Sequence, residues 1–232
     1  MRGTLSSFYE DSVRDCRQSV LDNLPPADVL LDFGCADGAL TSRFASRAGA
    51  RAVLGVEVLE ELADQARERG IEVVEPENGH LPIEDETVDA VTANQVIEHL
   101  ADTDGFVQEI HRVLRPGGTF VVSTNNLASW HNIVALVAGA QPFPSDVSSN
   151  PTVGKLMKPA HLDDTLQGEW ASWTHLRVFS YRALIEMMQQ HRFTVQRAQG
   201  VGYYPLPSRL ARRVAAWDPR HAAYLTVSCV KN

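Results

Sequence analysis

The stretch Leu31-Asp32-Phe33-Gly34-Cys35-Ala36-Asp37-Gly38-Ala39-Leu40 decides the fold. It continues an apolar run that begins at Val29 and leads into a helical pattern that ends near Ala48. This order predicts a buried strand, a glycine-containing turn and the start of a helix. Gly34 and Gly38 allow the backbone to approach a ligand closely, because neither residue carries a Cβ atom. The turn is therefore a candidate ligand-binding loop.

Outward from this turn, short apolar runs alternate with helical patterns. We expect strands over residues 29–33, 52–56, 71–74, 88–93 and 119–123, separated by helices over 40–48, 59–69 and 102–114. Strand–helix alternation with right-handed crossovers predicts an open parallel sheet with helices on both faces. Later in the chain we expect helices over 130–140, 179–191 and 208–217, and a closing pair of strands over 193–198 and 224–231. Ligands of such sheets bind at the carboxyl ends of the strands.

The composition is that of an ordinary globular protein. With 232 residues, 44% of them hydrophobic and 22% charged, the chain can bury a sizeable core, which excludes wholesale disorder. We expect neither a membrane span nor a secretory leader. The net charge of −8 disfavours a general nucleic-acid binder, so no nucleic-acid partner is expected. The cysteines have no metal-ligand spacing and indicate reduced thiols in a cytoplasmic protein: Cys16, Cys35 and Cys229.

The binding loop does not fit a dinucleotide. The fingerprint G-x-G-x-x-G needs a glycine where this chain has Ala36, and Asp32 places an acid beside the position of a diphosphate. Both features disfavour a nicotinamide-dependent reductase. Glu57 follows the second strand, where a carboxylate can accept both hydroxyls of a ribose; the alternative is an acid that stabilises a helix start. These residues favour a ligand that has a ribose and a positive charge but no phosphate. S-adenosylmethionine has all three properties.

The chain resembles the class I S-adenosylmethionine-dependent methyltransferases. Residues 31–38 resemble the first motif of that family, and residues 55–57 resemble the second. Later motifs follow in the family's order at 77–83, 94–100, 114–118 and 175–180. The resemblance implies a Rossmann-like α/β fold with a seven-stranded, mostly parallel sheet of order 3-2-1-4-5-7-6 and a lid inserted after strand five. It also implies S-adenosylmethionine as the methyl donor.

The resemblance also implies which residues contact the cofactor. They are Asp32, Gly34, Cys35, Gly38, Glu57, Val58, Glu77, Asn78, Asn94 and Gln95. We expect Asp32 to accept hydrogen bonds from loop amides as well as to contact the ligand. Glu77 stands where many relatives have Asp and has the alternative of an exposed loop acid, and Cys35 is expected to be packed rather than reactive.

We expect one methyltransferase domain over residues 1–232, with four parts. They are an N-terminal helical cap over 1–27, a cofactor-binding half over 28–124, a lid or substrate insertion over 125–178, and a C-terminal helix and strand pair over 179–232.

The pair Glu98–His99 is the candidate catalytic centre. An imidazole after the fourth strand would face the ligand and could take a proton from an acceptor hydroxyl; the alternative is a histidine that caps a helix start. Ubiquinone-type O-methyltransferases and small-RNA 2′-O-methyltransferases show a similar pair, in which a glutamate three residues earlier can complete a divalent-metal site. Here that position is Gln95, a poor ligand, so no metal is expected. Three further histidines have no partner assignable from sequence: His131, His161 and His175.

The favoured reaction is methylation of a hydroxyl oxygen of a small molecule, glycan or lipid-linked acceptor. The alternatives are C-methylation of a quinone-like ring and a non-catalytic S-adenosylmethionine-binding module. A lipophilic acceptor is favoured by aromatic residues in the expected lid: Trp130, Phe143, Trp170 and Trp173. It is also favoured by an apolar stripe flanked by arginines, which could contact a membrane surface or simply pack on the sheet: Leu206, Arg209, Leu210, Arg212, Arg213, Val214 and Trp217.

Overall fold

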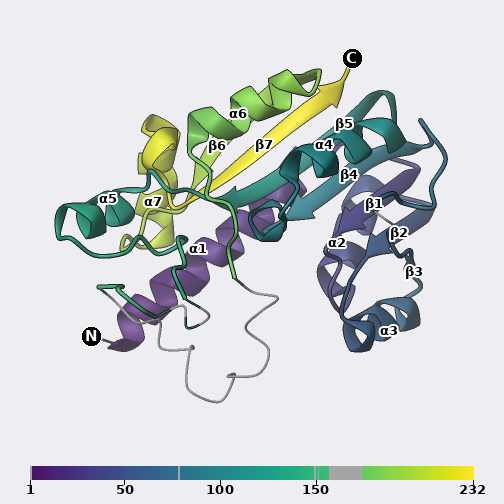
Figure 1. Cartoon of the computed structure of the whole chain (residues 1–232). Coiled ribbons are helices and arrows are strands. Elements are labelled where there is room, and N and C mark those ends of the chain that lie inside the picture. Colours follow the sequence, from purple (N-terminus) through teal and green to yellow (C-terminus); the bar gives the residue numbers. More distant parts are fainter. Residues whose placement is uncertain (1, 78, 149, 151, 157–173) are drawn as a thin grey trace.

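Strand β1 (Val29–Phe33) lies inside a seven-stranded sheet and pairs in parallel with β2 (Ala52–Val56) and β4 (Val88–Asn94). The computed structural model describes residues 2–77, 79–148, 150, 152–156 and 174–232 (Figure 1). The strand order is β3-β2-β1-β4-β5-β7-β6, which confirms the expected order. Every pairing is parallel except those of β7 with β5 and β6, so the closing strand pair is also confirmed.

The elements follow the expected alternation. The remaining strands are β3 (Glu72–Val73), β5 (Leu114–Asn125), β6 (Phe193–Val201) and β7 (Tyr224–Lys231). The helices are α1 (Arg2–Asn23), α2 (Ala39–Ala48), α3 (Glu60–Glu68), α4 (Thr103–Val113), α5 (Trp130–Val137), α6 (Tyr181–Gln190) and α7 (Ser208–Trp217). The described residues also form the short 3₁₀ helices η1 (Ile97–His99) and η4 (Pro219–His221).

Two strands, β5 and β6, are several residues longer than their apolar runs predicted, and β4 is longer by one residue. β5 begins at Leu114 rather than at residue 119, because Leu114 pairs with Val88 across a register shift in β4. β6 continues beyond residue 198 to Val201, which still pairs with Tyr224 of β7. In both cases backbone pairing with a neighbouring strand extends the strand through residues that carry no apolar pattern.

Both faces of the sheet are buried, which explains the nearly continuous apolar strands. Alternate side chains of one strand enter different cores. Leu31, Val91 and Phe120 join the core beneath α4 and α6, whereas their neighbours Leu30, Ala90 and Val121 join the core beneath α1 and α2. Polar side chains of the central strands therefore reach a ligand only near the strand ends.

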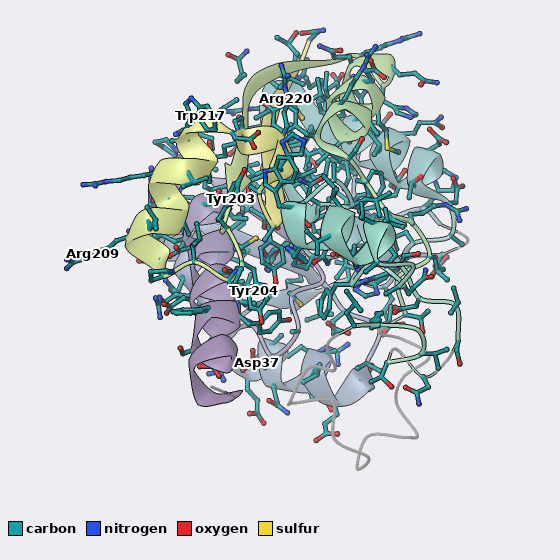
Figure 2. All side chains as sticks on the ribbon, turned by 90° about the vertical axis from the view of Figure 1, so that its left-hand side faces the viewer. Asp37, Tyr203, Tyr204, Arg209, Trp217 and Arg220 are labelled. Carbon is teal, nitrogen blue, oxygen red and sulfur yellow. The ribbon has the colours of Figure 1, made fainter. Side chains whose placement is uncertain are left out.

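The apolar stripe of α7 is divided between core and surface. Ala211 and Ala215 are buried, and Leu206 and Val214 pack beside them, so this part packs on the fold. Trp217 remains 85% exposed and points outward (Figure 2). Among the expected flanking arginines, Arg212 is paired with Asp15 of α1 at 2.7 Å.

Part of the expected lid lies outside the described residues, including His161, Trp170 and Trp173. The described part is organised by a buried ion pair between Lys155 and Asp146 at 2.5 Å. Among the described helices, none combines the length and apolar character needed to cross a membrane.

Candidate active site

The glycine turn connects β1 to α2 in a backbone conformation that residues other than glycine rarely adopt. Gly34 and Gly38 have φ angles of 78° and 79°. A Cβ atom at Gly34 would lie 2.5 Å from Val96 Cγ2, and one at Gly38 would lie 2.5 Å from Ile71 Cδ1. The glycines are thus required by backbone geometry and by close packing against these two side chains. The contact with Val96 also places the segment after β4 beside the turn.

Glu57 ties the glycine turn to the end of β2. Its Oε2 atom accepts a hydrogen bond from the amide of Ala36 at 3.0 Å. Its Oε1 atom accepts from the amides of Val58 and Leu59, which immediately precede α3, at 2.8 and 2.9 Å. The carboxylate therefore stabilises both the turn and the approach to the helix. A carboxylate offers about four lone-pair sites, so it retains acceptor capacity for a ligand hydroxyl.

Asp32 is buried beneath the turn and, contrary to the expectation from the sequence, accepts no hydrogen bond from the loop amides. Instead its two oxygens accept hydrogen bonds from the hydroxyls of Thr41, at 2.5 Å, and Thr92, at 2.6 Å. These partners come from α2 and β4, so the carboxylate joins three neighbouring elements. Burial raises the pKa of Asp32 to about 7, because no cation in the described residues compensates its charge.

The other expected cofactor residues occupy different environments. Cys35 is buried and burial raises its pKa to about 12, which confirms a packed thiol. Asn94 accepts a hydrogen bond from the Ser123 hydroxyl at 2.9 Å. Gln95 also contacts that hydroxyl, at 3.5 Å. Val58 and Glu77 are exposed, and Asn78 lies outside the described residues.

Glu98 and His99 form part of η1, directly after β4. Glu98 is only 1% exposed and accepts hydrogen bonds from Thr124 and Asn125 at 2.9 and 3.3 Å. Burial raises its pKa to about 7. His99 Nδ1 lies 3.2 Å from the carbonyl oxygen of Thr174, and burial lowers the pKa of the imidazole.

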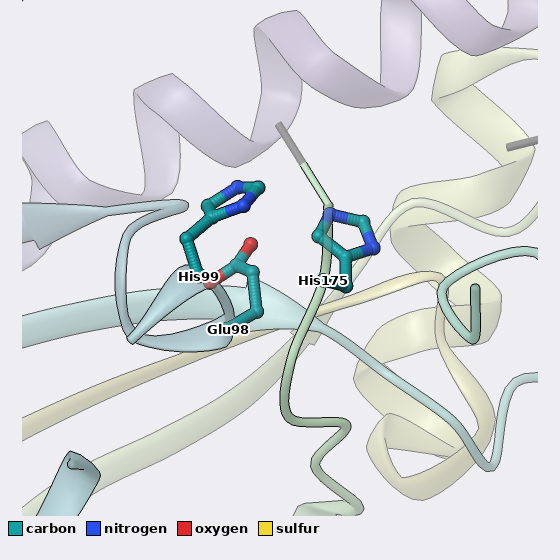
Figure 3. A group of neighbouring side chains, drawn as sticks. All are labelled: Glu98, His99 and His175. Carbon is teal, nitrogen blue, oxygen red and sulfur yellow. The ribbon is translucent and has the colours of Figure 1, made fainter. Parts of the chain in front are cut away.

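The structure adds His175, to which the sequence assigned no partner. Its ring centroid lies 4.9 Å from that of His99 (Figure 3). The backbone fixes this approach, because the amides of Leu176 and Arg177 both donate to the carbonyl oxygen of Glu98, at 2.8 and 3.0 Å. The only sequence signal was its position at the start of the last motif, before α6. A surface hollow of about 510 Å³ beside α6 and η4 shares no lining residue with this site.

Comparisons with known proteins agree with the fold. Residues 31–122 match the methyltransferase domain family. A Mycolicibacterium smegmatis protein described as a probable S-adenosylmethionine-dependent methyltransferase is 40% identical over 99 residues, which are 42% of this chain and 38% of that protein. The ubiquinone biosynthesis O-methyltransferase of Bradyrhizobium sp. is 32% identical over 123 residues, covering 48% of this chain and 45% of the relative. The matches thus span less than half the length of these relatives.

A solved S-adenosylmethionine-dependent methyltransferase from Thermotoga maritima has a TM-score of 0.61 at 18% identity, covering 97% of this chain and 91% of that chain. The sheet order and this likeness define a Rossmann-like methyltransferase fold. The family match over residues 31–122, these relatives and this fold together support a class I S-adenosylmethionine-dependent methyltransferase, a class whose methyl donor is S-adenosylmethionine.

The raised pKa of Asp32 predicts a pH-dependent stability. Between its usual pKa and about 7 the folded protein holds a proton that the unfolded chain has lost. The free energy of unfolding therefore falls as the pH rises through this range, by up to about 1.4 kcal/mol per pH unit from this group. We expect Asp32→Asn to remove the contribution of Asp32 to this pH dependence of the free energy of unfolding.

Urea unfolding of the ligand-free protein at several pH values measures the slope. A second variant, Asp37→Asn, changes a half-buried acid of the same turn, which pairs with Arg69, and controls for net charge. If wild type and Asp32→Asn have the same slope, the carboxylate is ionised in the folded protein at acidic pH.

Proposed function

We propose that this protein transfers the methyl group of S-adenosylmethionine to a hydroxyl oxygen of a small-molecule or lipid-linked acceptor. The acceptor oxygen attacks the methyl carbon, the bond from that carbon to sulfur breaks, and S-adenosylhomocysteine leaves. The hydroxyl proton passes to His99. The observation that carries the proposal is the His99 imidazole, held after β4 by the carbonyl oxygen of Thr174, with a pKa that burial lowers.

The tautomer of His99 suits a base. A backbone carbonyl only accepts hydrogen bonds, so the contact with Thr174 indicates that Nδ1 carries the proton and that the lone pair lies on Nε2. The lowered pKa keeps this lone pair available at neutral pH. Glu98 lies beside it, and an ionised carboxylate there would stabilise the imidazolium that forms.

The cofactor would lie across the carboxyl ends of β1, β2 and β4. In this arrangement Gly34 and Gly38 shape the turn beneath it, and Glu57 accepts a hydrogen bond from one ribose hydroxyl with its one remaining lone pair, on Oε2, rather than from both hydroxyls. Asp32 is buried beneath the turn, and its ionised form would place negative charge below a ligand that carries a positive sulfonium. The resemblance assigns the adenine to Glu77 and Asn78 and further contacts to Cys35, Val58, Asn94 and Gln95.

Carbon methylation is the second candidate reaction. The geranyl diphosphate C-methyltransferase of Streptomyces coelicolor shares this fold, with a TM-score of 0.59 at 16% identity. The O-methyltransferase name of the Bradyrhizobium relative and the neutral imidazole favour oxygen. A panel of hydroxylated and quinone-like acceptors, with the methylated position read by mass spectrometry, distinguishes the two reactions. Retained cofactor with no turnover on any acceptor would favour a non-catalytic binding module.

Replacing Glu57 by alanine tests the ribose contact. We expect Glu57→Ala to weaken S-adenosylmethionine binding by about 1.5–3 kcal/mol, the scale of a hydrogen bond to a charged group. Isothermal titration calorimetry measures the change. Glu60→Ala is the matched control, because Glu60 is an exposed acid at the start of α3 that pairs with Arg67. Wild-type affinity in Glu57→Ala would exclude the ribose assignment.

Replacing His99 by alanine separates proton transfer from cofactor binding. We expect His99→Ala to reduce turnover by about 10²–10⁴-fold, the typical contribution of a positioned base, with cofactor affinity near that of wild type. His131→Ala is the matched control, because His131 is a second histidine whose pKa burial lowers, to about 4, and it is outside this cluster. More than about half of the wild-type rate in His99→Ala would leave positioning alone as the source of catalysis.

A lipid-linked acceptor would bring the enzyme to a membrane surface. Trp217 and Leu210 of α7 are exposed, and Arg209 and Arg213 lie on the same helix. Figure 2 labels Trp217 and Arg209. We expect wild type to sediment with anionic vesicles at low salt, and Arg209→Ala/Arg213→Ala to sediment several-fold less. Arg51→Ala, an exposed arginine before β2, is the control. If wild type does not sediment, the acceptor is a soluble alcohol.

A further inference from the structure

Three side chains with metal-ligating atoms converge at the end of β4. Glu98 and His99 come from η1, and His175 comes from the segment that precedes α6 (Figure 3). One ligand atom of each residue lies within 4.8 Å of those of the other two. Ligands held by one zinc ion in tetrahedral geometry lie about 3.4 Å apart, so small side-chain rotations would bring these atoms to a common ion.

Both imidazoles are oriented as metal ligands usually are. His99 Nδ1 lies 3.2 Å from the carbonyl oxygen of Thr174, and His175 Nδ1 lies 3.1 Å from that of Pro144. The Asp146 carboxylate also lies 4.0 Å from His175 Nδ1. A ligating histidine commonly donates its second ring N–H to a carbonyl or carboxylate, which fixes the ring and leaves the other nitrogen unprotonated. Here that nitrogen is Nε2 of both residues.

The carboxylate of Glu98 lacks a positive partner. Its hydrogen bonds come from the uncharged Thr124 and Asn125, and no lysine or arginine of the described residues forms an ion pair with it. An ionised carboxylate at 1% exposure is costly without a compensating charge. Each oxygen accepts one of these hydrogen bonds and retains a lone pair for a cation.

We propose that Glu98, His99 and His175 bind one divalent transition-metal cation of the zinc type. Two imidazole nitrogens and one carboxylate oxygen form a set of three protein ligands with an open position, and nitrogen ligands favour zinc or cobalt over magnesium or calcium. The expected absence of a metal rested on Gln95, whose side chain contacts Ser123 and Cys16 instead. His175 supplies the third ligand that Gln95 cannot.

The cation site goes beyond the proposed methyl transfer. A bound cation would supply Lewis-acid polarisation of an oxygen atom in its open position. Backbone hydrogen bonds of this chain position the ligating side chains. The amides of Leu176 and Arg177 donate to the carbonyl oxygen of Glu98 and so fix the backbone next to His175. Since Nε2 of His99 cannot bind a cation and accept a proton together, the cation-free protein is the form in which His99 is available as a base.

Direct binding measurements test the site. Chelator-treated protein, freed of chelator, is titrated with Zn²⁺ by calorimetry and with Co²⁺ by visible absorption; Mg²⁺ is the comparison ion. We expect one equivalent of Zn²⁺ and of Co²⁺ and no comparable binding of Mg²⁺. We expect His175→Ala and Glu98→Gln each to weaken Zn²⁺ binding by at least about tenfold. His80→Ala should bind as wild type does, because His80 pairs with Glu109 elsewhere on the surface.

Two results would overturn the site. They are no stoichiometric Zn²⁺ binding by wild type, and equal Zn²⁺ affinity in wild type, His175→Ala and Glu98→Gln. S-adenosylmethionine titration of the same preparations shows that each variant is folded. Failure of the proposed function would instead appear as no methyl transfer by wild type with or without Zn²⁺, and it would leave the zinc titration unchanged.

Discussion

Burial of the sheet on both faces is the constraint on which the rest of the structure depends. In β1, β4 and β5, neighbouring side chains such as Leu30 and Leu31 enter opposite cores, so neither face of these strands is free for a ligand. Polar groups must then gather where the strands end. Glu57 follows β2, and Glu98 and His99 follow β4. The position of the site is thus a consequence of how the core is filled.

The sequence predicted this framework well because its signals are local. The run over 29–33 and the helix over 208–217 have the bounds that the apolar patterns gave. The helix pattern over 40–48 differs from α2 by one residue. The strand order was available only through the family resemblance, because periodicity does not identify which strands pair. Periodicity also missed the first residues of β5, whose pairing with β4 depends on the backbone.

Contacts within the site were harder to predict, because they join residues that are distant in the sequence. The sequence placed Asp32 near loop amides, whereas the fold brings Thr41 and Thr92 to its two oxygens. The sequence also left His175 without a partner. The position of His175 depends on the amides of Leu176 and Arg177, which donate hydrogen bonds to the carbonyl oxygen of Glu98. No side-chain pattern records a backbone contact of this kind, so tertiary structure was needed to find it.

The same burial that organises the site leaves it with two carboxylates that lack a cation among the described residues. Burial raises the pKa of both Asp32 and Glu98 to about 7, so each is costly to ionise in the ligand-free protein. Such groups reduce stability and are typical of functional sites. Asp32 lies below the glycine turn, where a sulfonium would compensate it, and Glu98 lies beside two imidazoles that could share a metal cation with it. Both ligands proposed for this site carry positive charge, and each would compensate the charge that one of these buried carboxylates has when it is ionised.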